Sequence, residues 1–190
     1  MRFSIFYLIS IIFSKLFTFL FFRKAKIVFW DVVFRRKNNF IYKQGLRIGR
    51  NSVIEILSND GEIQVGINFL VYQRLHIGCY KKIIIGDNVL VGSDVLITDH
   101  SHGQYSGEIQ SAPNIPPNQR EIVSDVVEIG SNVWIGDKVT ILKGVKIGEG
   151  SIIGANSLVN KDIPANVIAV GSPAKPIKKY SYEKRAWENL

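Results

Sequence analysis

The chain has 190 residues and a mass of 21.4 kDa, which suits one ordinary domain with an appendage. Hydrophobic residues make up 46% of it, which excludes an intrinsically disordered chain. The net charge of +8 is concentrated at the front, because residues 1–50 carry a net +10 and the remaining residues a net −2. The slightly acidic main body argues against a nucleic-acid-binding protein. A single cysteine, Cys79, excludes an internal disulfide framework and a zinc site built on paired thiolates.

Residues 1–42 form an apolar and basic segment that we expect to be distinct from a main domain over residues 43–190. Ten of the eleven phenylalanines lie within the first 40 residues, and Lys15 is the only charge between Phe3 and Phe22. Placed on a helix, the polar residues of this stretch gather on one side. This polar stripe consists of Ser4, Ser10, Ser14, Lys15 and Thr18.

A polar stripe with flanking cations favours a helix that lies in the membrane interface, so we expect residues 1–37 to contact the inner membrane surface. Two alternatives stay open: the helix packs against the main domain or a neighbouring subunit, or it spans the bilayer once. No small-x-small cleavage site follows the apolar run, so we expect no cleaved signal peptide. The cations expected to meet anionic headgroups are Arg23, Lys24, Lys26, Arg35, Arg36 and Lys37.

The body of the chain has a six-residue period. Aliphatic residues recur every six positions in three runs, and glycine directly follows many of them. A helical period of 3.6 residues does not fit this spacing over so many units, whereas short strands separated by turns do. The runs are Val65, Val71 and Ile77; Ile85, Val91 and Ile97; and Ile129, Ile135, Ile141, Ile147, Ile153 and Val159.

This period predicts an all-β, prism-like coil of short parallel strands, in which each hexapeptide forms one side. The aliphatic side chains point inward and stack on their equivalents in the next coil, because branched side chains pack tightly there. Residues such as Gly86-Asp87-Asn88 lie at corners that need tolerant φ values. The front segment is expected to cap one end of the coil, and a short helical tail within Pro164–Leu190 the other.

The six-residue grid breaks twice. The spacing from Ile77 to Ile85 is eight, and the spacing from Ile97 to Ile129 is thirty-two, which is not a multiple of six. Residues 98–124 therefore leave the coil as a protruding loop, and long excursions from a regular scaffold are usually functional or disordered. Two of the three histidines, His100 and His102, lie at the root of this loop.

Two segments, IGDNVLVGSDVLITDHSHG and VEIGSNVWIGDKVTILKGVKIGEGSIIGANSLVNKDIPANVIAVGSPAKPIKK, resemble the hexapeptide-repeat acyltransferases. The resemblance covers about residues 65–179 and is to the sugar O-acetyltransferase branch, which includes galactoside, maltose and nodulation-factor enzymes and capsule and O-antigen enzymes. It implies a left-handed parallel β-helix and a homotrimer with active sites between subunits. It also implies acetyl-CoA as co-substrate, bound along the groove between adjacent coils.

The resemblance further implies a histidine general base at the root of the loop. The catalytic histidine of the family falls seventeen positions after the Ile of the IGDN motif, and Ile85 plus seventeen is His102; His100 is the second candidate. A neutral imidazole can take the proton of a sugar hydroxyl as it attacks the thioester. Asp99 is expected to orient one imidazole. No nucleophile motif surrounds Cys79, so direct transfer is expected.

Other matches lie near acetyl-CoA in the family. Trp134, in Val-Trp-Ile-Gly, matches a tryptophan near the active site, and Ala155 matches a small residue whose backbone contacts the pantetheine arm. Cations are favoured against anionic oxygens, so basic residues near the end of the coil suit the phosphates of the cofactor. The residues matched near the arm or the phosphates are Asn160, Lys161, Lys175 and Lys178.

The sequence departs from the family at two places. The acceptor-binding asparagine of galactoside acetyltransferases has no counterpart, and Gln73 or Arg74 occupies that region. The usual serine after Trp-Ile-Gly is Asp137. The first departure argues against a simple galactoside acceptor, and Arg74 suits either an acidic or phosphate-bearing acceptor or a surface ion pair.

Three other functions are alternatives for a coil with these residues. A γ-carbonic-anhydrase-like metal site would use three histidines, but the spacings among His76, His100 and His102 do not match that pattern, so no metal is expected. A non-catalytic scaffold would not need the histidine loop together with Trp-Ile-Gly. An acetyltransferase for serine, an amino sugar or an antibiotic stays an alternative.

The apolar front segment favours a polysaccharide or lipid-linked sugar as acceptor. We therefore expect an acetyl-CoA-dependent O-acetyltransferase acting on a sugar hydroxyl of a surface polysaccharide or of its lipid-linked precursor. Because acetyl-CoA is supplied in the cytoplasm, the expected location is the cytoplasmic face of the inner membrane.

Overall fold

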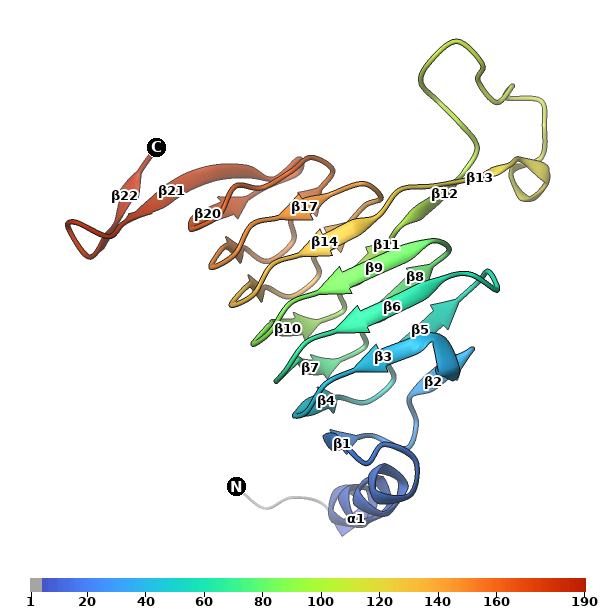
Figure 1. Cartoon of the computed structure of the whole chain (residues 1–190), viewed down its shortest axis with the longest axis vertical. Coiled ribbons are helices and arrows are strands. Elements are labelled where there is room, and N and C mark those ends of the chain that lie inside the picture. Colours follow the sequence, from blue (N-terminus) through green and yellow to red (C-terminus); the bar gives the residue numbers. More distant parts are fainter. Residues whose placement is uncertain (1–4) are drawn as a thin grey trace.

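A computed structural model describes residues 5–190, most of which form a parallel β-helix with three sides (Figure 1). Successive strands pass from sheet A to sheet B to sheet C, and each pairs in parallel with the strand one coil away. Sheet A contains β1 (Ala25–Val28), β4 (Leu46–Ile48), β7 (Leu70–Gln73), β10 (Leu90–Ser93), β15 (Trp134–Ile135), β18 (Ile152–Ile153) and β20 (Val167–Val170). Sheet B contains β2 (Val33–Arg35), β5 (Val53–Ile56), β8 (His76–Cys79), β11 (Leu96–Thr98), β16 (Thr140–Ile141) and β19 (Leu158–Val159). Sheet C contains β3 (Phe40–Tyr42), β6 (Glu62–Val65), β9 (Lys82–Ile85), β14 (Val127–Ile129) and β17 (Lys146–Ile147).

The predicted aliphatic grid forms the core. Every residue of the three runs is buried, and none exposes more than 4% of its surface. In sheet A the pairing register stacks Val71, Val91, Ile135 and Ile153 in one column. Burying each such side chain stabilises the fold by about 1.5–3 kcal/mol, so the hexapeptide period and the parallel β-helix have one physical cause.

Asparagines build the corner between sheets C and A. Asn68, Asn88 and Asn132 adopt φ values of 56°, 57° and 59°, the left-handed region that asparagine tolerates well. Their side chains form a ladder, because Asn68 donates to Asn88 at 3.1 Å and Asn88 donates to Asn132 at 3.3 Å. The corner is therefore stabilised by stacked amides as well as by turn geometry.

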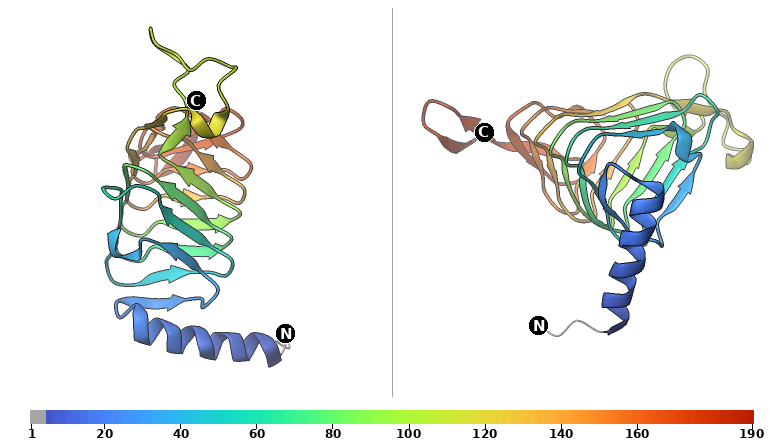
Figure 2. Two further views of the ribbon diagram at one scale, coloured as in Figure 1. Left: turned by 90° about the vertical axis from the view of Figure 1, so that its right-hand side faces the viewer. Right: turned by 60° about the horizontal axis from the view of Figure 1, so that its bottom comes forward.

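Helix α1 (Ile5–Phe21) crosses the N-terminal end of the β-helix (Figure 2). The hydroxyls of the polar stripe face the first coil, since Ser10, Ser14 and Thr18 are the buried residues of α1, whereas Lys15 is exposed. The backbone N–H of Val28 donates to Thr18 Oγ1 at 2.8 Å, and that of Trp30 donates to Ser14 Oγ at 3.3 Å. These hydroxyls satisfy backbone groups at the open edge of the coil, which explains why the stripe is polar. Ser4 lies outside the described residues.

The opposite side of α1 is an exposed apolar surface. We call it the apolar face; it consists of Ile5, Phe6, Leu8, Ile9, Ile12, Phe13, Leu16, Phe19 and Leu20. Soluble proteins rarely expose a continuous apolar surface of this kind without a partner. Among residues 5–190 there is no helix long and apolar enough to cross a membrane.

The coil begins earlier than the boundary predicted at residue 42. Strands β1, β2 and β3 all pair with the second coil, so residues 25–42 form the first coil. Two of the cations assigned to the membrane are used within the protein. Arg36 donates to the backbone oxygens of Ile56 and Leu57, and Lys37 donates to the Phe21 carbonyl at the end of α1.

The predicted helical tail is wrong: the C-terminus is a β-hairpin. Strand β21 (Lys175–Ser181) pairs antiparallel with β20, and β22 (Ala186–Asn189) pairs antiparallel with β21. Pro176 lacks an N–H and disfavours a helix interior, whereas the edge of sheet A offers backbone partners. The rings of Tyr180 and Trp187 pack across the hairpin at 5.2 Å.

The predicted loop leaves the coil where expected. Strand β11 ends at Thr98, and β12 (His100–His102) then pairs antiparallel with β13 (Ile122–Ser124). Between them the chain projects from the coil, and η2 (Pro117–Gln119) lies in this projection. Figures 1 and 2 show the loop and the C-terminal hairpin projecting from different corners of the prism.

Candidate active site

Both interruptions of the six-residue grid lie at the turn from sheet B to sheet C, which we call the B–C corner. The eight-residue spacing inserts Tyr80 and Lys81 between β8 and β9, and in the next coil residues 99–126 leave the coil. The widened turn presents three backbone N–H groups to the Asp99 carboxylate. Tyr80, Lys81 and Lys82 donate to it at 2.7, 2.7 and 2.8 Å.

Asp99 is a fully buried carboxylate. Burial acts to raise its pKa, but hydrogen bonds from His100 and from the three backbone amides outweigh burial and hold the pKa below the usual range. Asp99 is therefore ionised at neutral pH.

The His100 imidazole lies against this carboxylate. Its Nδ1 is 3.2 Å from Asp99 Oδ1 and 3.2 Å from the Thr98 hydroxyl, and only 13% of the side chain is exposed. An ionised carboxylate favours the tautomer with the proton on Nδ1, which leaves a lone pair on Nε2. Gly78 makes room for the ring, because a Cβ there would lie 3.2 Å from His100 Cε1.

His102 lies two residues further along β12, so both imidazoles are on one face of the β12–β13 ladder. The two rings meet edge to face at a centroid distance of 6.5 Å. The His102 side chain is exposed, and among residues 5–190 it has no carboxylate partner. The structure thus gives the orienting carboxylate to His100.

The loop beyond the histidines is organised by Arg120. Its guanidinium donates to the Ile115 carbonyl at 2.8 Å, the Pro113 carbonyl at 3.2 Å and the Tyr105 hydroxyl at 2.6 Å. The Tyr105 hydroxyl donates to the backbone oxygen of His102. The loop is therefore connected by hydrogen bonds to β12, which carries the two histidines.

Cys79 does not serve as a nucleophile. It is buried, and burial together with the neighbouring Asp99 carboxylate raises the pKa of its thiol to about 12. Since the thiolate is the nucleophilic form of cysteine, a thiol that stays protonated at neutral pH is inert. This agrees with the expectation of direct transfer.

Trp134 and Ala155 line one cavity of about 510 Å³ on sheet A. Trp134 is 51% exposed there, although tryptophan is usually well buried. Asp137, which replaces the serine of the family, also lines the cavity and accepts the Ser93 N–H at 2.6 Å. We call this cavity the sheet A groove.

The predicted phosphate-binding residues lie at two places. Lys175 and Lys178 lie on β21, opposite Val170 and Ile168 at the C-terminal end of sheet A. Asn160 and Lys161 are exposed and follow β19, at the B–C corner.

The predicted acceptor residues also separate. Gln73 lines a cavity on the N-terminal half of sheet A. Arg74 follows β7 and forms a two-point ion pair with Asp94, in which Nη2 and Oδ2 are 2.8 Å apart. The surface ion pair is thus the arrangement that this chain shows for Arg74.

Within one chain the two sets of predicted residues do not meet. Asp99, His100 and His102 lie at the B–C corner, whereas Trp134 and Ala155 lie on sheet A, the remaining side of the prism. A site that uses both sets needs the corner of one chain and the sheet of another. Among residues 5–190 no three His, Cys, Asp or Glu side chains are grouped to hold a metal ion.

The sequence predicts both histidines but not the backbone amides that hold Asp99. The only signal for them was the eight-residue spacing between Ile77 and Ile85. Tyr72 was also missed; its exposed ring lines both the sheet A groove and the cavity beside it.

Comparison with known proteins identifies the family. The model of bacterial transferase hexapeptide (six repeats) matches residues 127–161, and that of the hexapeptide repeat of succinyl-transferase matches residues 82–98. The Escherichia coli K12 protein WbbJ, named provisionally as a lipopolysaccharide biosynthesis O-acetyl transferase, is 36% identical over 181 residues, covering 95% of this chain and 92% of WbbJ. This chain belongs to the hexapeptide-repeat acyltransferases.

Two further members place it in the sugar O-acetyltransferase branch. Galactoside O-acetyltransferase of the same organism is 34% identical over 152 residues, covering 76% of this chain and 68% of that enzyme. The solved structure of a galactoside acetyltransferase with coenzyme A has a TM-score of 0.59 and 29% identity, covering 81% of this chain and 72% of the other. AntD, an N-acyltransferase from Bacillus cereus, has a TM-score of 0.70 at 20% identity, covering 84% of each chain, and supports the fold alone.

Proposed function

We propose that this enzyme transfers an acetyl group from acetyl-CoA to a sugar hydroxyl of a surface polysaccharide or of its lipid-linked precursor. The observation that carries the proposal is the contact between the buried Asp99 carboxylate and His100 Nδ1 at 3.2 Å. It prepares a neutral imidazole with a free lone pair at the root of the loop, as a general base requires. The names of the relatives WbbJ and galactoside O-acetyltransferase support the sugar acceptor.

In the proposed reaction the imidazole Nε2 takes the proton of the acceptor hydroxyl while its oxygen attacks the thioester carbonyl. The C–S bond then breaks, and the coenzyme A thiolate recovers the proton from the imidazolium. The ionised Asp99 stabilises the imidazolium while it carries the proton. A positioned base of this kind contributes about 10²–10⁴-fold to the rate.

Different observations favour His100 and His102 as the general base. Counting from the IGDN motif favours His102, whereas the carboxylate contact and low exposure favour His100. We propose His100 as the base, because its ring is held in one orientation and one tautomer. His102, on the same face, is then placed to bind the acceptor.

We infer a homotrimer in which each active site lies between two chains. The separation of the B–C corner from the sheet A groove supports this inference, since one chain cannot place His100 beside Trp134. Acetyl-CoA is proposed to lie along the sheet A groove, with its pantetheine arm near Ala155. Lys175 and Lys178 on β21 extend the same sheet and are proposed to meet its phosphates.

The apolar face of α1 is proposed to rest on the inner surface of the cytoplasmic membrane. The side of α1 opposite the coil is apolar, and several exposed lysines and arginines lie near its C-terminal end. Burying such a face in the headgroup region is favourable, and the cations add attraction to anionic lipids. In this orientation the hydroxyls of the polar stripe contact the first coil and do not face water, as a helix lying alone in the membrane interface would require.

Mass spectrometry of surface glycan tests the proposed function. Cells would carry the wild-type enzyme, His100→Ala or His76→Ala, where His76 is a matched control on the preceding coil of sheet B, paired with Glu55. We expect glycan acetylation with wild type and His76→Ala and none with His100→Ala. Acetylation that is equal in all three strains would refute the proposal, and glycan unaffected by deletion of the gene would point to a small soluble acceptor.

Flotation with liposomes tests the membrane contact. Phe13→Glu with Leu16→Glu places two charges in the apolar face, whereas Ile109→Glu places one on the exposed loop as a control. We expect wild type and Ile109→Glu to float with phosphatidylglycerol liposomes and the double variant to remain in solution. Flotation of the double variant would contradict the membrane assignment.

A further inference from the structure

A cavity of about 740 Å³ lies between α1 and the first coils of sheet A. Its lining includes Lys15 from α1, Lys26 from β1, Arg47 from β4 and Arg50 just after it, and no acidic residue. We call these four residues and the space between them the basic groove. Three consecutive layers of the structure therefore direct positive charge into one space.

The charges of the basic groove are poorly compensated within the chain. In the part of the chain that the structure describes, the side chains of Lys15 and Arg47 have no ion-pair or hydrogen-bond partner. Lys26 has one long hydrogen bond, 3.5 Å, to Asn68. The Nε of Arg50 is buried without a hydrogen bond and lies 3.5 Å from an Asp31 carboxylate oxygen. Lys15, Lys26 and Arg47 are exposed, so their charges stay hydrated, and as neighbouring cations they attract an anion into the groove.

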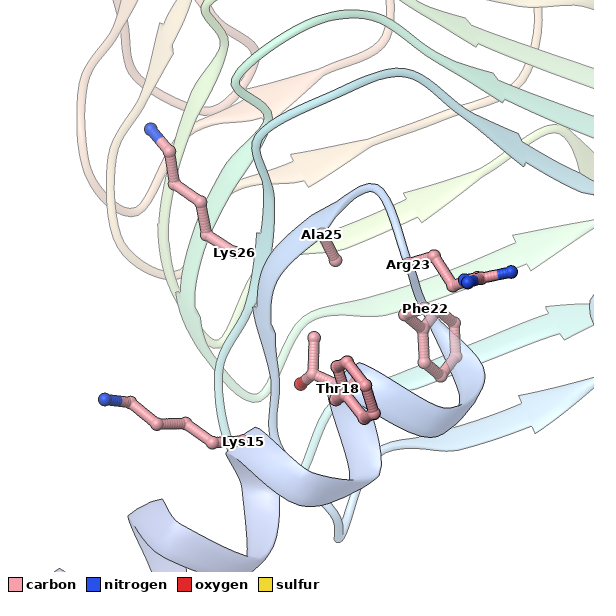
Figure 3. Close-up of a pocket in the computed structure, with 7 residues that line it drawn as sticks. Lys15, Thr18, Phe22, Arg23, Ala25 and Lys26 are labelled. Carbon is pink, nitrogen blue, oxygen red and sulfur yellow. The ribbon is translucent and has the colours of Figure 1, made fainter.

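Two side chains of the groove extend in the same direction. Figure 3 shows that Lys15 and Lys26, from different elements, both extend to one side of the junction between α1 and β1, while Arg23 extends to the other. Lys15 and Lys26 thus place positive charge on the same side of this junction. Arg23 therefore offers a nearby cation that does not belong to the groove.

The basic groove lies between α1 and the sheet A groove. Its walls include the α1 residues Tyr7 and Ile11, and Tyr72 lines both cavities. Arg47 on β4 and Trp134 on β15 are three strand steps apart, or about 14 Å at the usual strand spacing. A ligand anchored by its anion at Arg47 would thus reach Trp134 along sheet A.

We propose that the basic groove binds the phosphate or diphosphate of a lipid-linked acceptor, an inference that rests on the proposed function. The hydrocarbon chain stays in the membrane on which the apolar face rests, the phosphate or diphosphate lies in the space lined by Lys15, Lys26, Arg47 and Arg50, and the sugars extend along sheet A. The acetylated sugar then lies about 14 Å from the phosphate, so it is not the sugar attached to it. The acceptor enters from the α1 end of the sheet, and acetyl-CoA from the β21 end.

Binding titrations of the full-length protein in detergent test this site. The probes are farnesyl diphosphate, farnesol, inorganic pyrophosphate and phosphatidylglycerol. Lys26→Gln with Arg47→Gln removes two groove cations, and Arg23→Gln with Lys24→Gln removes the same charge outside the cavity. We expect farnesyl diphosphate to bind wild type and the control alike and to bind the groove variant at least tenfold more weakly. Farnesol and phosphatidylglycerol should show no such difference, and pyrophosphate should show a smaller one.

Equal binding of farnesyl diphosphate to both double variants would overturn the proposal. A tenfold loss of phosphatidylglycerol binding in the groove variant alone would assign the groove to bilayer headgroups and would also overturn it. A loss of coenzyme A affinity in the groove variant would also overturn the proposal, because the cavity would then bind acetyl-CoA and not the acceptor. Groove-dependent binding of farnesyl diphosphate by a protein that acetylates no glycan would support the site while refuting the proposed function.

Discussion

Sheet A and the B–C corner belong to the same hexapeptide repeat, but sheet A follows its period and the B–C corner interrupts it. Sheet A keeps regular pairing from β4 to β20, and its outer surface carries a groove. The B–C corner takes two extra residues after β8 and a long loop after β11, and it carries the buried Asp99 and His100. Regular repetition makes a binding surface, whereas a reacting group needs a local departure that can hold a charge. The predictions below separate these two contributions.

The largest expected effect is at the corner. His100→Ala should lower kcat by about 10²–10⁴-fold, because the oriented base is lost while the coil is unchanged. His102→Ala should lower kcat less and raise KM for the acceptor. Steady-state kinetics with acetyl-CoA and the purified acceptor measure both values. The reverse order of effects would assign the base to His102, as the motif count predicts.

The regular part of the fold should respond in stability rather than in chemistry. Ile83→Ala removes a fully buried side chain of β9 and should lower the free energy of unfolding by about 2–5 kcal/mol. Ile84→Ala, at the next position of the same strand, faces outward and should cost less. Urea unfolding of the two variants provides the comparison. Similar losses would contradict the inward stacking of the grid.

Asp99 contributes both to catalysis and to stability, since it orients His100 and accepts hydrogen bonds from three backbone amides. Asp99→Ala should cost about 1–3 kcal/mol for the buried donors left without an acceptor. Because hydrogen bonds hold the pKa of Asp99 below its usual range, its contribution to stability is present above the ordinary carboxyl pKa of about 3.9. It is lost as the pH falls further, through the lowered pKa. The free energies of unfolding of wild type and Asp99→Ala, measured from pH 3 to 7, should therefore approach each other only at the acid end of this range.

The smallest expected effect is in the sheet A groove. Trp134→Ala should raise KM for acetyl-CoA about tenfold, roughly 1.4 kcal/mol, and leave kcat within a few-fold. Ile41→Ala, on sheet C and 50% exposed, is a control of similar accessibility away from the groove. Equal KM values for the two variants would remove Trp134 from the donor site.

The same contrast explains what sequence alone could predict. The grid of Ile and Val gave the coil, its core and the loop, because burial imposes a strict period on them. The direction of the polar stripe of α1 could not be predicted, since hydroxyls suit water and an open strand edge equally well. The hairpin after Lys175 was missed because it depends on the free edge of β20. The Asp99–His100 contact depends on the turn formed by Tyr80 and Lys81, and no local sequence motif predicts that turn.

The central claim is that the B–C corner of one chain acts with the sheet A groove of another. Mixing subunits of His100→Ala with subunits of Ala155→Tyr, which fills the groove, tests it directly. Each variant alone should be nearly inactive. After denaturation and reassembly together, mixed trimers should regain a substantial part of wild-type acetyl transfer, because some sites combine an intact corner with an intact groove. A mixture no more active than its two components would contradict a site shared between chains.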